Sequence, residues 1–129
     1  MPSIFTKIIN GDIPAHKVAE NDKFLAFLDI APLQKGHTLV VPKKEIDDIF
    51  DLEDELLAEM ILFSKTISKK IQKVFPCNRV GMTVIGLEVP HAHIHLIPIN
   101  KETDMNFHSP KLNLTQEELE SIANDLANA

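Results

Sequence analysis

The apolar positions of the chain follow two different spacings, which predict one long helix and several strands. From Asp51 to Val74 the spacing is three or four residues, as one face of a helix requires. The apolar members of this stripe are Leu52, Leu56, Met60, Phe63, Ile67, Ile71 and Val74. Acidic residues at the start of the segment and lysines at its end match the helix dipole. We therefore expect a structural helix over residues 51–74 and assign it no catalytic role.

Shorter runs, rich in apolar and β-branched residues and bounded by turn residues, predict five strands. They cover residues 16–20, 24–29, 37–42, 80–85 and 92–99. Short helices are expected over residues 4–9 and after Thr115, which can form a capping box with Glu118. Residues 100–114 show neither spacing, which indicates a loop. Because strands and helices do not alternate, the predicted fold class is α+β, with a five-stranded antiparallel sheet, one long central helix and short terminal helices.

Length and charge limit the classes of protein to consider. The 129 residues suit one domain, spanning residues 1–129, that is large enough to bury a core. No apolar run approaches the roughly 20 residues of a membrane span, and the start of the chain lacks the apolar stretch of a signal peptide. The single cysteine, Cys77, cannot form an internal disulfide, which favours a cytoplasmic protein. The net charge of -6 argues against a nucleic-acid partner, because phosphate backbones require a basic surface.

The candidate chemistry lies in the last predicted strand, where His91, His93 and His95 alternate with apolar residues. Alternate positions of a strand share one face, so the three imidazoles should point one way and the apolar residues between them the other. Near neutral pH an imidazole can serve as nucleophile, proton donor or metal ligand. We therefore interpret these three residues as the functional centre.

Three interpretations of the pattern remain open at this point. Two of the histidines could share a zinc ion with His37, but Cα atoms at i and i+4 lie roughly 13 Å apart, too far for all three to do so. Alternatively, a neutral imidazole could attack phosphorus and form a covalent intermediate, while its neighbours position oxygens and protonate the leaving group. His93 suits the nucleophile because a histidine flanks it on each side. Solvated histidines on an exposed sheet face are the inert alternative.

The segment His91-Ala-His-Ile-His-Leu-Ile97 resembles the motif of the histidine-triad (HIT) family, closest to its Hint-type branch. The resemblance extends over residues 4–14, 25–30 and 36–44 and covers roughly the first hundred residues. It implies a nucleotide-binding α+β fold, usually a homodimer whose two sheets continue across the interface. It also implies that the protein hydrolyses the linkage between a nucleoside monophosphate and a leaving group. That linkage would be a phosphoramide, an anhydride or a similar bond, and the preferred base would be a purine.

The resemblance also implies roles for individual residues. His93 matches the nucleophile, His95 the residue that contacts phosphate and leaving-group oxygens, and His91 and His37 the partners that complete the histidine cluster. Asp29 matches the carboxylate that holds the ribose hydroxyls. The positions that line the base pocket in the family are Phe5, Ile8, Phe27 and Ile30.

The chain departs from many bacterial relatives at their structural zinc site. The relatives use a Cys-x-x-Cys pair, a histidine after Pro-Lys-Lys and the first triad histidine. Here the first three positions are Ser3, Thr6 and Glu45. With three of four ligands absent, we expect no structural zinc and no other cofactor.

A second departure lies just before the histidines, where relatives carry polar side chains that bind phosphate. Leu87 and Glu88 take the places of an amide and a hydroxyl. An unpaired buried carboxylate beside a phosphate would repel it by several kcal/mol, so Glu88 either turns away or favours a cationic leaving group. Binding without turnover is therefore the first alternative to a nucleotide hydrolase, and a metal-dependent hydrolase is the second.

Overall fold

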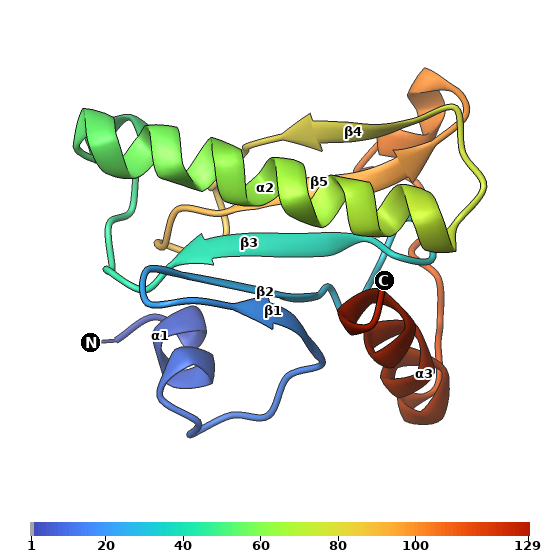
Figure 1. Cartoon of the computed structure of the whole chain (residues 1–129), viewed down its shortest axis with the longest axis horizontal. Coiled ribbons are helices and arrows are strands. Elements are labelled where there is room, and N and C mark those ends of the chain that lie inside the picture. Colours follow the sequence, from blue (N-terminus) through green and yellow to red (C-terminus); the bar gives the residue numbers. More distant parts are fainter. Residues whose placement is uncertain (1) are drawn as a thin grey trace.

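The computed structural model describes residues 2–129, which form one sheet with helices on both faces (Figure 1). The elements in chain order are α1 (Ile4–Ile9), β1 (Lys17–Glu20), β2 (Phe24–Leu28), β3 (Thr38–Pro42), the 3-10 helix η1 (Ile49–Asp51), α2 (Asp54–Val74), β4 (Arg79–Thr83), β5 (Ile94–Ile99), the 3-10 helix η2 (Glu102–Met105) and α3 (Gln116–Ala127). The strands are ordered β1-β2-β3-β5-β4, and each neighbouring pair is antiparallel. This confirms the predicted α+β class. Within residues 2–129, no helix has the length and hydropathy needed to span a bilayer.

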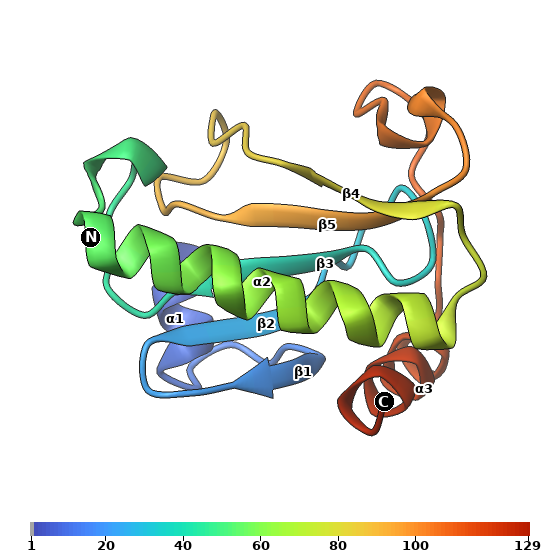
Figure 2. The same ribbon diagram turned by 45° about the horizontal axis from the view of Figure 1, so that its top comes forward.

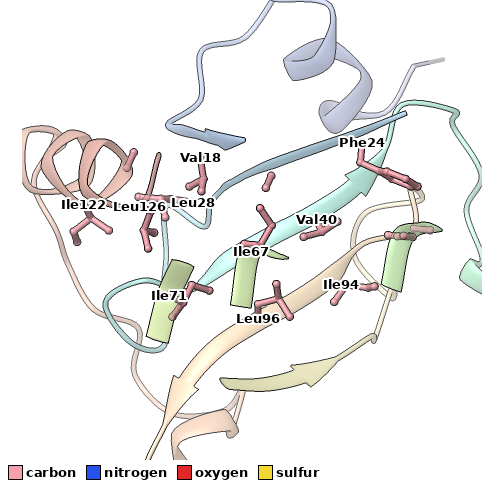
Figure 3. Packing of buried hydrophobic residues seen from close by; sticks show 14 of the residues in the cluster. Val18, Phe24, Leu28, Val40, Ile67, Ile71, Ile94, Leu96, Ile122 and Leu126 are labelled. Atoms are coloured by element: carbon pink, nitrogen blue, oxygen red, sulfur yellow. The ribbon is translucent and has the colours of Figure 1, made fainter. Parts of the chain in front are cut away.

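The alternation of side chains along β2, β3 and β5 divides the interior into two clusters, one on each face of the sheet. Figure 2 shows α2 along one face, with α1 behind the strands. The larger cluster joins α2 and α3 to the strands, and its labelled members in Figure 3 include Phe24, Val40, Ile67, Ile94 and Leu126. The predicted stripe of the long helix supplies Met60, Ile67 and Ile71 to this cluster. The stripe is therefore structural, as predicted.

The smaller cluster occupies the opposite face of the sheet. It consists of Phe5 and Ile8 from α1 with Leu25, Phe27, Leu39 and Val41 from β2 and β3. Because β2 and β3 are buried on both faces, every residue of both strands is buried. The histidine face of β5 adjoins this smaller cluster, so α1 lies beside the candidate chemistry.

The long helix begins later than predicted, so the expected start at Asp51 is wrong. Residues 49–51 form η1, Leu52 and Glu53 are extended, and α2 starts at Asp54. The Asp48 side chain caps η1 by accepting a hydrogen bond of 2.9 Å from the backbone N–H of Phe50. The Asp48 contact therefore defines η1 as a separate turn, although the helix predicted over residues 51–74 includes the end of η1 as well as α2.

Several other predicted boundaries are wrong by one or two residues. β5 begins at Ile94 rather than at residue 92, because the backbone N–H of Ala92 donates to the Ile46 carbonyl outside the sheet. The predicted loop over residues 100–114 also contains η2, and the Asp104 carboxylate caps its start by accepting from the backbone N–H groups of Asn100 and Lys101. The capping box of Thr115 and Glu118 is present and starts α3, as predicted.

Candidate active site

His91 and His93 immediately precede β5 and His95 lies within it, and all three face away from the larger core cluster. Ala92, Ile94 and Leu96 belong to that cluster, so the predicted division between the two faces is confirmed. His91, His93 and His95 are 0%, 7% and 8% exposed. The interpretation as solvated histidines on an exposed sheet face is therefore wrong. Buried imidazoles need hydrogen-bond partners, and those partners fix their protons.

His93 is held in the tautomer that leaves its outer nitrogen unprotonated. Its Nδ1–H donates to the backbone carbonyl of His91 over 2.8 Å. No residue from 2 to 129 bonds to its Nε2, and this atom is not among the fully buried unpartnered atoms. The Nε2 lone pair therefore faces solvent. An imidazole in this state is a nucleophile.

His95 is held in the opposite tautomer by His37. The backbone N–H of Leu33 donates to Nδ1 of His37 over 3.1 Å, so the His37 proton must lie on Nε2. That Nε2–H in turn donates to Nδ1 of His95 over 2.9 Å. The His95 proton is therefore on Nε2, which has no partner among the described residues and reaches solvent. His95 thus presents a hydrogen-bond donor beside the His93 lone pair, with the two ring centroids 4.9 Å apart.

Burial keeps this histidine pair neutral. It lowers the pKa of His37 to about 3 and the pKa of His95 to about 4, with smaller contributions from neighbouring positive charge. The hydrogen bonds act in the same direction, because protonating Nδ1 of His95 would set two N–H groups against each other. At neutral pH, His95 can therefore donate a hydrogen bond but holds no extra proton.

Asp29 lies next to the pair, just beyond the end of β2. Its Oδ2 is 3.6 Å from Nε2 of His37, and its Oδ1 accepts a hydrogen bond from the backbone N–H of Ala31. Burial raises the pKa of its carboxyl group, and the Ala31 hydrogen bond opposes this shift. The carboxylate is 23% exposed, so a second ligand can still reach it.

Asp29, His37 and His95 bring three potential ligand atoms within 4.8 Å of one another, as a metal centre would require. A metal on Nε2 of His37 would force its proton onto Nδ1, where the N–H of Leu33 already points. The same metal would replace the hydrogen bond between His37 and His95. The observed hydrogen bonds therefore suit a fixed pair of tautomers better than a metal centre.

Three of the four residues predicted for the base pocket lie together. Phe5, Ile8 and Phe27 belong to the smaller cluster, and the Phe5 ring packs edge-on against His93 with a centroid distance of 5.0 Å. Ile30 does not join them and is 70% exposed. An apolar wall therefore adjoins the nucleophile candidate on the side of α1.

Two residues near the histidines were missed because they lie in the segment predicted as a loop. The Phe107 ring packs edge-on against His95 and His37, at centroid distances of 4.9 and 6.1 Å. Lys111 places its Nζ 5.9 Å from the Phe107 ring centroid, and its charge helps to lower the pKa of His37, after burial and His95. An isolated aromatic residue in a loop carries no periodic signal, so only the folded chain brings it to the site.

Comparison with known proteins agrees with this geometry. Residues 10–102 match the sequence model of the HIT domain. The chain belongs to the histidine-triad (HIT) family. An adenosine 5'-monophosphoramidase from Schizosaccharomyces pombe is 35% identical over 129 residues, covering 98% of this chain and 97% of the relative.

Two solved HIT structures share the fold over nearly the whole chain. A HIT-like protein from Bartonella henselae is 30% identical, with a TM-score of 0.84 and coverage of 98% of this chain and 95% of that chain. A zinc-bound HIT protein from Mycobacterium smegmatis is 27% identical, with a TM-score of 0.79 and coverage of 97% and 93%. The five-stranded sheet and long helix are thus a HIT-like α+β fold.

The segment before the HIT motif is open to solvent in this chain. Leu87 is 89% exposed, and Glu88 is also exposed and forms no ion pair with any residue from 2 to 129. Glu88 still adds a small upward contribution to the pKa of Asp29, behind burial as the main cause. The charge of Glu88 therefore affects Asp29 electrostatically although the Glu88 side chain is solvated.

One surface cavity lies away from the HIT histidines. It measures about 540 Å³ and is lined by the turn between β1 and β2 together with one side of α2, including Phe24, Glu59 and Leu62. It contains no histidine and adjoins a surface ion pair between Lys23 and Glu59. We place the chemistry at the histidines, because they combine buried imidazoles with two accessible nitrogens of opposite character.

Proposed function

We propose that the protein hydrolyses nucleoside 5'-monophosphates linked to an amine, a phosphate or a similar leaving group, through a nucleotidyl intermediate on His93. The observation that carries this proposal is the pair of accessible nitrogens. Nε2 of His93 offers a lone pair, and Nε2 of His95 offers a hydrogen-bond donor beside it. Nucleophilic substitution at phosphorus requires this combination of an attacking atom and a donor for the developing negative charge.

The reaction proceeds in two displacements. Nε2 of His93 attacks phosphorus, the bond from phosphorus to the leaving nitrogen breaks, and the released amine takes a proton from solvent. Water then attacks phosphorus and loses a proton to solvent, and the bond to Nε2 breaks to give the nucleoside monophosphate and the neutral imidazole. His95 donates a hydrogen bond to a phosphoryl oxygen in both steps. We assign it no proton transfer, because its Nδ1 is occupied as an acceptor.

The apolar wall and Asp29 suit the nucleoside part of such a substrate. Phe5 and Phe27 offer ring faces and edges for a base, at a mutual centroid distance of 5.5 Å. Asp29 retains a partly exposed carboxylate that could accept ribose hydroxyls. The phosphoramidase activity named for the fission-yeast relative supports an adenosine substrate. We therefore propose a purine nucleotide or nucleoside phosphoramidate as ligand.

Intact-mass analysis with adenosine 5'-phosphoramidate tests the proposal. We expect a transient adduct of one adenylyl group in the wild type, release of AMP, and neither in His93→Ala. His108→Ala is the matched control, because His108 is exposed and lies outside the histidine cluster. Turnover by His93→Ala at the wild-type rate would refute the assignment, and activity lost on chelation would favour a metal-dependent hydrolase.

A non-catalytic nucleotide-binding module is the second candidate. The observation in its favour is the replacement of polar phosphate contacts by Leu87 and Glu88. A binding module would show a thermal shift with AMP but no adduct and no turnover. The same mass experiment therefore separates the two functions.

Glu88 also suggests which leaving group is preferred. An exposed carboxylate near the site would attract a cationic amine and repel an anionic group. We expect Glu88→Gln to lower turnover of substrates with a cationic amine leaving group more than turnover of substrates with an alcohol leaving group. Equal effects on both classes would remove this preference from the proposal.

We further propose a homodimer that extends the sheet through β4. This strand is at the edge of the sheet and pairs only with β5 among the described residues. Beside the free edge, Met82, Val84 and Ile85 are 54%, 39% and 47% exposed, and a second copy would bury them. Light scattering after gel filtration should give twice the chain mass, and Met82→Glu should lower it. A monomeric wild type would contradict this arrangement.

A further inference from the structure

The positions that hold zinc in many bacterial HIT proteins come together here as a hydrogen-bonded cluster. Oε1 of Glu45 accepts two hydrogen bonds of 2.6 Å, from the backbone N–H of Ser3 and from the Thr6 hydroxyl. The Ser3 hydroxyl donates to Nδ1 of His91 over 2.7 Å. The bond from Ser3, followed by that from Thr6, lowers the pKa of Glu45 to about 2. Four residues that are 88 positions apart at most thus form one network.

This donor set does not fit a zinc ion. Structural zinc sites use thiolates and imidazoles, and serine and threonine hydroxyls are not among their usual ligands. Both nitrogens of His91 are also in use. Nδ1 accepts from Ser3, and Nε2–H donates to the Pro42 carbonyl over 2.7 Å. The Ser3 hydroxyl therefore occupies the His91 lone pair that a metal would need.

The cluster connects directly to the nucleophile candidate. His91 is completely buried, and its backbone carbonyl is the acceptor that fixes the tautomer of His93. Phe5, which lies between Ser3 and Thr6 in the chain, packs edge-on against both rings, at 5.8 Å from His91 and 5.0 Å from His93. A movement of the start of α1 would therefore change two contacts of His93 at once.

We propose that Glu45, acting through Ser3 and Thr6, is a positioning residue that fixes His91 and thereby His93 without a metal. Glu45 joins the segment after β3 to the N-terminus of α1, which is the connection that zinc makes in relatives. The effect on turnover rests on the proposed hydrolase activity, whereas the effect on the histidine rings does not. The two parts can therefore fail separately.

The test compares Glu45→Ala with Glu45→Gln and with Asp47→Ala. Glutamine keeps a carbonyl oxygen that can accept both hydrogen bonds, whereas alanine removes them. Asp47 is an exposed carboxylate two residues away with no side-chain hydrogen bond in residues 2–129, so it controls for the loss of charge. Ser3→Ala keeps the backbone N–H that donates to Glu45 but removes the hydroxyl that donates to His91 and caps α1, and it serves if Glu45→Ala does not fold.

The decisive measurement is nitrogen-15 NMR of the imidazole rings, which needs no substrate. In Glu45→Ala we expect changed His91 resonances and faster exchange of the His93 Nδ1 proton, with near wild-type values in Glu45→Gln and Asp47→Ala. We also expect kcat to fall about 10-fold with little change in KM, the range typical of residues that orient a ligand or nucleophile from behind. Unchanged ring resonances in both Glu45→Ala and Ser3→Ala would overturn the proposal. Stoichiometric zinc in the purified wild type would also overturn it.

Discussion

Mild acid should destabilise this protein strongly, because two neighbouring imidazoles are buried in the neutral form. The folded chain holds the pKa of His37 near 3 and that of His95 near 4, whereas an unfolded histidine titrates near 6.5. Between pH 6.5 and about 4, His37 and His95 bind protons in the unfolded chain but stay neutral in the folded chain. The free energy of unfolding must therefore decrease as the pH falls through this window.

The size of the effect follows from the distance to the unfolded pKa. A pH of 5 is 1.5 units below the ordinary histidine pKa of 6.5, and each unit corresponds to about 1.36 kcal/mol, which gives roughly 2 kcal/mol per histidine. The pair then contributes about 4 kcal/mol, a large part of the 5–15 kcal/mol that stabilises a typical domain. The pKa of His91 is also lowered by burial and adds to the loss.

Urea denaturation at pH 7, 6 and 5 measures this quantity. Far-UV circular dichroism is the suitable signal, because the chain contains no tryptophan or tyrosine. We expect the free energy of unfolding to fall by about 4 kcal/mol between pH 7 and pH 5. His37→Gln keeps an N–H donor toward His95 but removes one titrating group, so its loss over the same range should be about 2 kcal/mol.

Two results would refute this reasoning. One is a wild-type stability that changes by less than about 1 kcal/mol from pH 7 to pH 5, well below the sum expected from the shifted pKa values. The other is an NMR titration in which either ring becomes protonated near pH 6.5. Measurements below pH 5 are less useful, because burial raises the pKa of Asp29 and its protonation in the folded state acts in the opposite direction.

Three further substitutions test the packing around the site. Ile67→Ala, in the core under β5, should cost about 2–5 kcal/mol in urea denaturation, whereas the exposed Leu62→Ala should stay within about 0.5 kcal/mol. Gly36→Ala should cost about 1–3 kcal/mol, since Gly36 has a φ of 95° and a methyl group would lie 2.8 Å from a ring carbon of Phe75; a neutral result would refute the strain. Phe107→Ala should admit water beside His95 and raise its pKa above 4 toward the ordinary value in an NMR titration, while the exposed Phe50→Ala leaves it unchanged.

The periodic parts of the fold could be predicted from the sequence because each periodicity has one physical cause. The stripe from Leu56 to Val74 repeats as a helix must, and burial of one face enforces that repeat. The alternation of imidazoles and apolar residues correctly assigned the two faces of β5. The ends of the elements were less predictable, since they depend on single contacts such as Asp48 with Phe50 or Ala92 with Ile46.

The candidate site divides in the same way. The alternating pattern and the resemblance to HIT proteins identified the histidines. Neither could show which ring nitrogen carries each proton. The positions of those protons depend on the backbone N–H of Leu33 and the backbone carbonyl of His91. Because nearly every residue carries such groups, the sequence does not indicate which of them will bond to a histidine. Phe107 was missed for a related reason, because a loop position becomes part of the site only through the path of the chain. Ser3, Thr6 and Glu45 could be identified as absent zinc ligands, but their mutual hydrogen bonds appear only in the folded chain.

The accessible Nε2 atoms of His93 and His95 are fixed in the same general way. His93 and His95 each use their inner nitrogen for a buried hydrogen bond, one as donor to a carbonyl and the other as acceptor from His37. A half-turn of either ring would break its buried hydrogen bond, so the two rings do not exchange these roles without that cost. The lone pair of one ring and the proton of the other therefore face solvent before any ligand binds. In the proposed hydrolysis, such preorganisation would avoid reorienting dipoles during the reaction, which is the main way in which a polar site lowers a barrier.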